Sequence, residues 1–116
     1  MMRDRMKALL PVVVISMMPL MTAQAFQGNP DQGREIFMQR CSICHGMDGR
    51  GNDGMAVDFR EEWYRLTKSD AELMQSLRNG LSTPGRNYTA GMMPPQMLNE
   101  REMYDVLSYL RAVFMQ

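Results

Sequence analysis

The chain has 116 residues, and its 13 Lys and Arg balance its 13 Asp and Glu. That length accommodates one domain, and an apolar fraction of 45% excludes an intrinsically disordered composition. A neutral chain is not expected to bind nucleic acid, which requires a basic face against the phosphates. Two cysteines are too few for a disulfide-rich scaffold. We therefore expect one globular domain.

Residues 1–25 have the three parts of a secretory signal peptide. A positively charged start over residues 3–7 precedes an apolar run over 8–20, and residues 23–25 read Ala-Gln-Ala, a cleavage site. The apolar run is shorter than the roughly 20 residues of a membrane-spanning helix. We predict a leader over 1–25 that is removed on export to the periplasm, and a mature domain over 26–116. The alternative is an uncleaved N-terminal anchor, which would place the protein at the membrane.

The first helix of the mature domain is expected to begin after Asn29, a good N-cap that a proline follows. Gln32 occupies the capping-box position. Gly33, Phe37 and Cys41 share one face at a spacing of four residues. Because glycine costs about 1 kcal/mol against alanine inside a helix, Gly33 marks either a close approach of another helix or a frayed first turn.

Two further helices follow, and each is opened by a capping box. Ser69 begins the second helix, Gly80 ends it, and Leu73 and Leu77 mark its buried side. Asn99 begins the third helix, whose apolar residues recur at helical spacing. The residues of this stripe are Met103, Val106, Leu107, Leu110 and Phe114.

Loops rich in glycine, proline and polar residues separate these helices, over residues 46–54 and 82–97. No segment shows the alternation typical of a strand, so we predict an all-α fold. Three short helices and two long loops supply only a thin core. A domain of this size commonly needs a disulfide, a metal or a cofactor to be stable, so the sequence should supply one.

Both cysteines and the only histidine lie in one pentapeptide, C-S-I-C-H, at residues 41–45. C-x-x-C-H is the signature of covalent c-type haem attachment. Two thiols on one helical turn can form thioethers with the two vinyl groups of a haem, and the next residue can then ligate the iron. We predict one haem c that is attached through Cys41 and Cys44, with His45 as the proximal ligand.

Other uses of this motif fit the sequence less well. A thiol–disulfide oxidoreductase carries C-x-x-C near a β-α-β pattern, and this sequence has no such pattern. A structural zinc ion needs four ligands, whereas the motif offers three. A structural disulfide between Cys41 and Cys44 would explain neither the adjacent His45 nor the long loops.

The run Gly-Met-Met-Pro-Pro-Gln-Met at residues 91–97 supplies candidates for the sixth iron ligand. A thioether sulfur is a soft ligand, and His/Met ligation raises the reduction potential of a haem. Met93 precedes a proline, which favours an extended backbone, and two prolines stiffen the loop. We predict Met93 as the ligand, with Met92 and Met97 as alternatives. The methionines that do not bind iron would pack against the haem as adaptable apolar side chains.

From about residue 28 to residue 114 the chain resembles a small bacterial class I c-type cytochrome. The pieces that carry the resemblance are Gly33-Arg34-Glu35-Ile36-Phe37, the C-x-x-C-H-G run, Gly49-Arg50-Gly51, Met92-Met93-Pro94-Pro95 and Tyr109-Leu110. The resemblance implies a cytochrome c-like fold of three main helices and loops wrapped around one haem. It also implies that Gly33 and Phe37 pack where the terminal helices cross, against Val106, Tyr109 and Leu110.

Members of this family often bond a haem propionate with an aromatic side chain. Trp63 and Tyr88 are candidates for that role. Trp63 is equally suited to packing in the core or the haem pocket, because a buried indole N–H needs a partner in any case.

The resemblance implies an electron-transfer protein that is not an enzyme by itself. With a histidine and a methionine on the iron, no position is open for a substrate. The expected redox partners are a membrane cytochrome complex or a periplasmic reductase, dehydrogenase or oxidase, met by a monomer in a weak complex. Lys68 is the single lysine after the leader, so we do not expect the lysine-rich docking surface of mitochondrial cytochrome c.

Two alternatives to a free carrier remain open from the sequence. The same haem domain could be a dedicated subunit of one dehydrogenase or reductase complex. If Met92 and Met93 both pack away from the iron, the haem would instead bind a gas or a peroxide.

Overall fold

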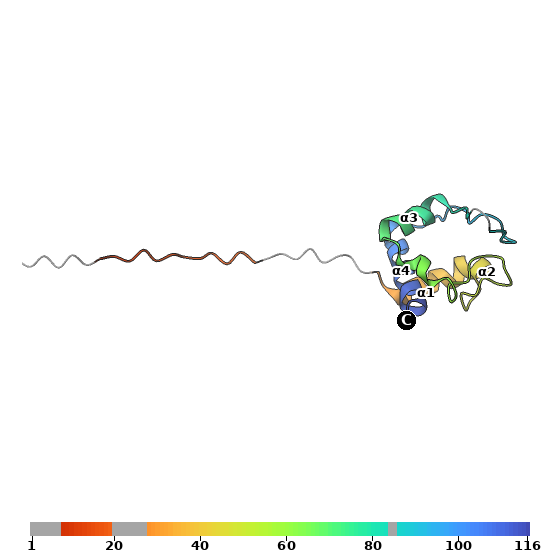
Figure 1. Cartoon of the computed structure of the whole chain (residues 1–116), viewed down its shortest axis with the longest axis horizontal. Coiled ribbons are helices and arrows are strands. Elements are labelled where there is room, and N and C mark those ends of the chain that lie inside the picture. The colour runs from red at the N-terminus through yellow and green to blue at the C-terminus, as the bar shows by residue number, and fades with distance from the viewer. Residues whose placement is uncertain (1–7, 20–27, 84–85) are drawn as a thin grey trace, which may run out of the picture.

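The computed structural model describes residues 8–19, 28–83 and 86–116. Residues 8–19 carry no regular secondary structure and are exposed (Figure 1). The rest of the predicted leader, with its cleavage site, lies outside the described residues. Among the described residues, no helix is both long enough and apolar enough to span a membrane.

Helices and connecting loops form the body of the domain (Figure 1). The α-helices of the described chain are α1 (Pro30–Ile36), α2 (Ser42–His45), α3 (Asp70–Asn79) and α4 (Glu100–Phe114). A π-helical segment, η1 (Phe37–Cys41), joins α1 to α2, and a 3-10 helix, η2 (Trp63–Thr67), precedes α3. Extended pairing within the described ranges is confined to one isolated antiparallel bridge between Leu81 and Met93. The prediction of a helical domain is therefore confirmed.

The start of α1 is tied to α4. Asn29 Oδ1 accepts the backbone N–H groups of Asp31 at 2.9 Å and Gln32 at 3.3 Å, which confirms Asn29 as the N-cap. The predicted capping box with Gln32 is wrong. The N–H of Asn29 instead donates to Asp105 Oδ1 of α4 at 2.7 Å. A buried carboxylate is a stronger acceptor than a neutral side-chain amide, so Asp105 takes this donor.

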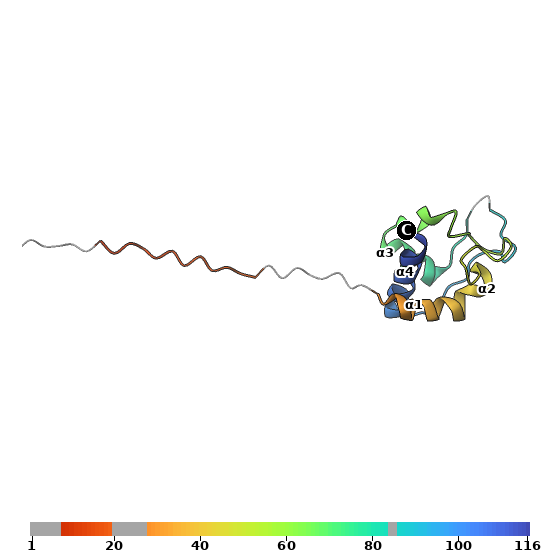
Figure 2. The same ribbon diagram turned by 90° about the horizontal axis from the view of Figure 1, so that it is seen from below.

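The two terminal helices cross at Gly33, in the arrangement that Figure 2 shows for α1 and α4. A Cβ at Gly33 would lie 1.9 Å from the carbonyl oxygen of Asp105 and 2.9 Å from Tyr109 Cβ. The predicted close approach is confirmed, and a frayed first turn is wrong. Phe37 follows one turn later, with its ring centroid 5.4 Å from that of Tyr109. The crossing therefore holds the start of the helical run that carries the C-x-x-C-H motif.

The later helices begin at the predicted caps. Ser69 with Glu72 and Asn99 with Glu102 form complete capping boxes, which confirms the predicted starts of α3 and α4. The predicted apolar stripe of α4 is buried along its whole length. Arg111 of α4 donates to the carbonyl oxygens of residues 66 and 68, at 3.2 and 3.0 Å, and so fastens η2 to α4.

The helical run that contains the motif is not a regular α-helix, because η1 interrupts it between α1 and α2. In η1 the backbone N–H of Ser42 donates to the carbonyl oxygen of Phe37, five residues earlier. Ser42 Oγ also donates to the carbonyl oxygen of Met38 at 2.6 Å. This wide turn shifts Cys41 out of the register that a spacing of four from Phe37 predicts. Single π-turns inside helices are frequent at functional sites.

Candidate functional site

A cavity of about 360 Å³ lies between α2, α3, α4 and the loops. That size is within the range of small-molecule and cofactor pockets, about 300–1,000 Å³. The cavity wall contains every residue that the sequence predicts to hold the haem, namely Cys41, Cys44, His45 and Met93. Residues of α2 and of α3 both line the cavity, and Figure 1 shows these helices well apart. The fold thus brings the motif at residues 41–45 and the methionine loop to one space.

The two cysteines face this cavity as half-buried free thiols. Ile43, which lies between them, points to solvent and is 68% exposed. Burial raises the pKa of the Cys41 thiol to about 11, although the charge of Arg40 lowers it and Cys44 raises it further. A thiol with a raised pKa is unlike the acidic thiol of a disulfide oxidoreductase. The described residues also hold no group of three His, Cys, Asp or Glu side chains suited to a metal ion.

His45 is the last residue of α2, and two glycines secure it. Gly46 ends the helix with φ 78°, a backbone conformation that residues with a side chain rarely adopt. The N–H of Gly51 donates to the carbonyl oxygen of His45 at 2.7 Å. Burial lowers the pKa of His45, and the nearby backbone of Val57 raises it in part. The imidazole is therefore neutral at pH 7, which is the form that ligates metals.

Two side-chain polar atoms of the cavity-lining residues are buried and have no hydrogen-bond partner among the described residues. They are Nδ1 of His45 and the hydroxyl oxygen of Tyr88. Buried polar atoms in folded proteins nearly always have a partner, so each exception needs an explanation. A bound molecule in the cavity would explain the hydroxyl of Tyr88, which was a predicted partner for a haem propionate.

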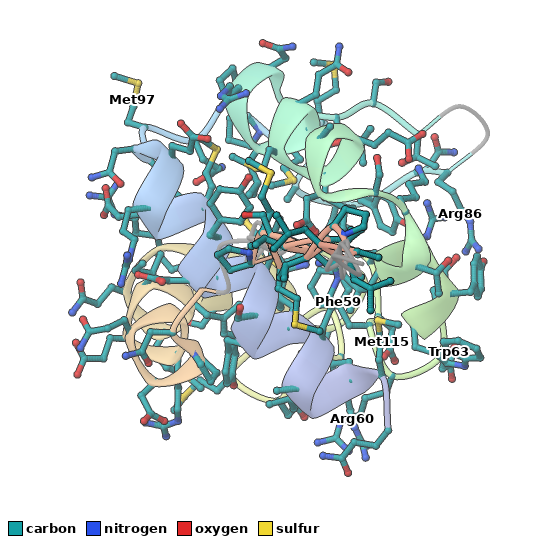
Figure 3. The ribbon with its side chains drawn as sticks, turned by 90° about the vertical axis from the view of Figure 1, so that its left-hand side faces the viewer. Phe59, Arg60, Trp63, Arg86, Met97 and Met115 are labelled. Carbon is teal, nitrogen blue, oxygen red and sulfur yellow. The ribbon has the colours of Figure 1, made fainter. Side chains whose placement is uncertain are left out.

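Of the three candidate methionines, Met93 is the most enclosed. It is half-buried against the core, and its backbone N–H and C=O pair with Leu81 at 3.0 Å each. Met92 also lines the cavity but is 63% exposed. Met97 is 86% exposed, does not line the cavity, and lies at the outer edge of the molecule (Figure 3).

The position of Trp63 fits neither of its predicted roles, bonding a haem propionate or packing in the core or haem pocket. Its side chain is 48% exposed, it does not line the cavity, and Figure 3 shows it at the edge of the molecule. It begins η2, whose buried residue is Leu66. The one-turn helix therefore buries Leu66 and leaves Trp63 outside.

A charged cluster at the cavity was not predicted from the sequence. Arg65, Lys68 and Arg86 line it, and its described lining contains no acidic residue. Glu62, 9% exposed, lies next to the lining and accepts from both arginines. Its partner Arg86 lies 24 residues further along the chain, and a pair so distant produces no periodic or local signal in a sequence. The wall is therefore apolar with a cationic side.

Residues 30–114, most of the chain, match the family described as Cytochrome c. The chain belongs to the cytochrome c family. Proteins of this family transfer electrons and carry covalently bound haem c, and the C-x-x-C-H motif of this chain is of the kind that binds it. The recognition of a small c-type cytochrome is thereby confirmed.

Three relatives illustrate where such domains occur. The chain is 29% identical over 90 residues to a "Cytochrome c-553-like" protein of Synechocystis, covering 77% of this chain and 73% of that protein. It is 33% identical over 82 residues to the cbb3-type cytochrome c oxidase subunit CcoP of Helicobacter pylori, covering 71% of this chain. It is 26% identical over 92 residues to a thiosulfate dehydrogenase of Psychrobacter arcticus, covering 74% of this chain. In each of the last two comparisons the match spans 26% of the relative's length.

The cavity residues fit a haem. Cys41 and Cys44 are unpaired thiols, His45 is a neutral imidazole, and the wall is largely apolar. The cationic side chains of the wall suit the two carboxylates of a haem, and the orphaned hydroxyl of Tyr88 could donate to one of them.

Proposed function

We propose that the protein is a periplasmic electron carrier with one haem c, attached through Cys41 and Cys44 and ligated axially by His45 and Met93. The observation that carries this proposal is the meeting of these four residues at one cavity, although His45 and Met93 are 48 positions apart in the chain. When bound, the haem supplies one-electron chemistry between Fe(III) and Fe(II). The residues of the chain hold, shield and orient it.

The choice of Met93 over Met92 follows from burial. A ligand sulfur must be shielded from water and held in place, because a thioether is a weak ligand. Met93 is half-buried and is held on both backbone sides by Leu81, whereas most of the Met92 side chain is exposed. His45 and Met93 together favour a raised reduction potential, as expected for His/Met ligation.

The periplasmic location rests on the leader pattern of residues 1–25 and on the kind of cofactor. The exposed residues 8–19 have the length and composition of a signal-peptide core. We propose that residues 26–116 form the exported protein, which meets its redox partners in weak complexes as a monomer.

A second candidate function is a dedicated subunit of a redox enzyme complex. The observation in its favour is that two relatives are named as an oxidase subunit and as a thiosulfate dehydrogenase. In that case the domain would exchange electrons with one tightly bound oxidase or dehydrogenase. Purification of the native protein under mild conditions separates the two candidates, because a dedicated subunit stays with its complex and a free carrier elutes alone.

The primary test is the visible spectrum of the protein made in a host with haem c maturation machinery. We expect haem that survives denaturation and a low-spin spectrum with the weak red sulfur-to-iron band. Met93→Ala should abolish that band, whereas the matched variant Met92→Ala should retain it. A covalent haem without the band would favour binding of a gas or a peroxide, and the absence of covalent haem would refute the proposal.

A further inference from the structure

Glu62 is a buried carboxylate for which electron transfer itself provides no role. Its side-chain oxygen Oε1 accepts from the hydroxyl of Tyr64 at 3.1 Å, from Nη2 of Arg65 at 3.0 Å and from Nη2 of Arg86 at 2.7 Å. The side chain of Glu62 is 12% exposed. Burial of a charge is costly unless opposite charges and hydrogen-bond donors surround it. Here the single oxygen Oε1 accepts hydrogen bonds from all three side chains.

The two arginines connect Glu62 to different parts of the fold. Arg65 lies three residues further along, in η2 itself. Arg86 begins the segment of residues 86–93, which ends at Met93. The bond to Arg65 is therefore local, whereas the bond to Arg86 connects η2 to the segment that carries the proposed iron ligand.

The segment 86–93 buries little of itself. Tyr88 and Met93 are half-buried, and its other residues are exposed. Hydrogen bonds fasten its middle and its end: Thr89 and Ala90 donate to the carbonyl oxygens of residues 54 and 55, at 3.0 and 3.3 Å. The bridge to Leu81 holds Met93. Segments with little buried apolar surface open locally at low free-energy cost, so polar attachments decide whether they stay closed.

Glu62 provides the attachment at the N-terminal end of this segment, where it bonds Arg86. The side chain of Arg86 is 51% exposed, so solvent screens an ordinary ion pair there and weakens it. The bond with Glu62 is short and charge-assisted, and its acceptor is nearly buried. The carboxylate is itself anchored by Arg65 and by the fastening of η2 to Arg111 of α4.

We propose that Glu62 is a positioning residue, which holds the segment 86–93 over the cavity through Arg86 and thereby keeps Met93 on the iron. This inference rests on the proposed ligation by Met93. The bond to Arg65 fixes the carboxylate, and the bond to Arg86 transmits that position to the methionine segment.

The test compares Glu62→Gln with Glu61→Gln in the haem-loaded protein. Glu61 is an exposed neighbour of the same chemistry, and its contact, to Asp58, is made by its backbone N–H.

Urea is the denaturant, because it does not screen charges. The sulfur-to-iron band reports the methionine, and far-UV circular dichroism reports the helices. At a fixed urea concentration below global unfolding, we expect Glu62→Gln to raise the population without the band about tenfold, as loss of one charge-assisted hydrogen bond predicts. Glu61→Gln should leave that population unchanged.

A double-mutant cycle separates positioning from general stability. Glu62→Gln and Arg86→Gln should be non-additive in their effect on the band, because they remove the same attachment. Two transitions are followed in urea: the helical transition, measured by circular dichroism, and the transition of the sulfur-to-iron band. Arg65→Gln should shift both to lower urea concentration by the same amount. The inference is overturned if Glu62→Gln shifts the transition of the band no further than the helical transition, or if it behaves like Glu61→Gln.

Amide hydrogen exchange at Thr89 and Ala90 gives a readout that does not need the band. Faster exchange in Glu62→Gln than in Glu61→Gln supports the attachment, and equal rates overturn it. A wild-type protein with covalent haem but no sulfur-to-iron band would refute ligation by Met93, and with it that step of the inference. Hydrogen exchange would then still decide whether Glu62 holds the segment.

Discussion

Phe59 lies nearly flat against the imidazole of His45, with ring centroids 4.7 Å apart and ring planes inclined by 20°. The ring of Phe114, at the end of α4, packs on Phe59, with the two ring centroids 5.6 Å apart. Phe114 also lies so close to Gly49 that a Cβ there would be 2.3 Å from its ring. The C-terminal end of α4 therefore supports the proposed iron ligand through the rings of Phe114 and Phe59, of which Phe59 is stacked on His45.

Truncation of Phe59 should destabilise the haem-loaded protein. Phe59→Ala removes a buried ring between His45 and Phe114, and such truncations cost about 3–5 kcal/mol. Phe59→Leu keeps most of the volume and should cost less than half as much. Urea unfolding followed by circular dichroism measures both. Equal costs for the two variants would show that filling this space is unimportant.

Gly33→Ala should weaken the crossing of the terminal helices. The added Cβ would meet the backbone of Asp105 at 1.9 Å, and a helix backbone cannot move aside as a flexible side chain can. We expect a loss of about 3 kcal/mol in unfolding free energy, at the upper end of typical overpacking costs. The control is Gln32→Ala, at the neighbouring exposed position of α1. A loss below about 0.5 kcal/mol for Gly33→Ala would contradict the observed crossing.

The contribution of Glu62 to stability should depend on pH in one direction. Burial raises the pKa of Glu62, but hydrogen bonds from Arg65 and Tyr64 and the charges of Arg65 and Arg86 bring it below its ordinary value of 4.5. A carboxyl group whose pKa is lowered in the folded state stabilises the protein above its unfolded pKa, and loses that contribution as pH falls through the folded pKa. The difference in unfolding free energy between wild type and Glu62→Gln should therefore be constant near pH 7 and shrink below pH 4.5. A difference that grows on acidification would contradict this sign.

Covalent attachment should depend on both thiols and not on the residues between them. We expect the Cys41→Ser/Cys44→Ser double variant to lose all haem when it is denatured, because no thioether can form. Ile43→Ser changes an exposed position of the same motif and should retain the haem. Haem staining of a denaturing gel measures both variants. Haem that stays with the double variant would show attachment elsewhere.

Local signals in the sequence were enough to predict the helix starts and the haem motif. Asn29, Ser69 and Asn99 cap their helices through hydrogen bonds that span three residues or fewer. The C-x-x-C-H motif likewise occupies only five consecutive residues. Such features depend on neighbours along the chain, so the residue types and their spacing determine them.

Contacts between distant segments decided the rest. The sequence allows two interpretations of Gly33, and the backbone of Asp105, 72 residues away, decides between them. The carboxylate of that same Asp105 displaced Gln32 from the predicted capping box. The pairing of Glu62 with Arg86 and the exposure of Trp63 likewise depend on how the loops pack. Short-range hydrogen bonds leave a readable spacing in the sequence, whereas packing and charge pairing across the fold depend on where the whole chain places each side chain.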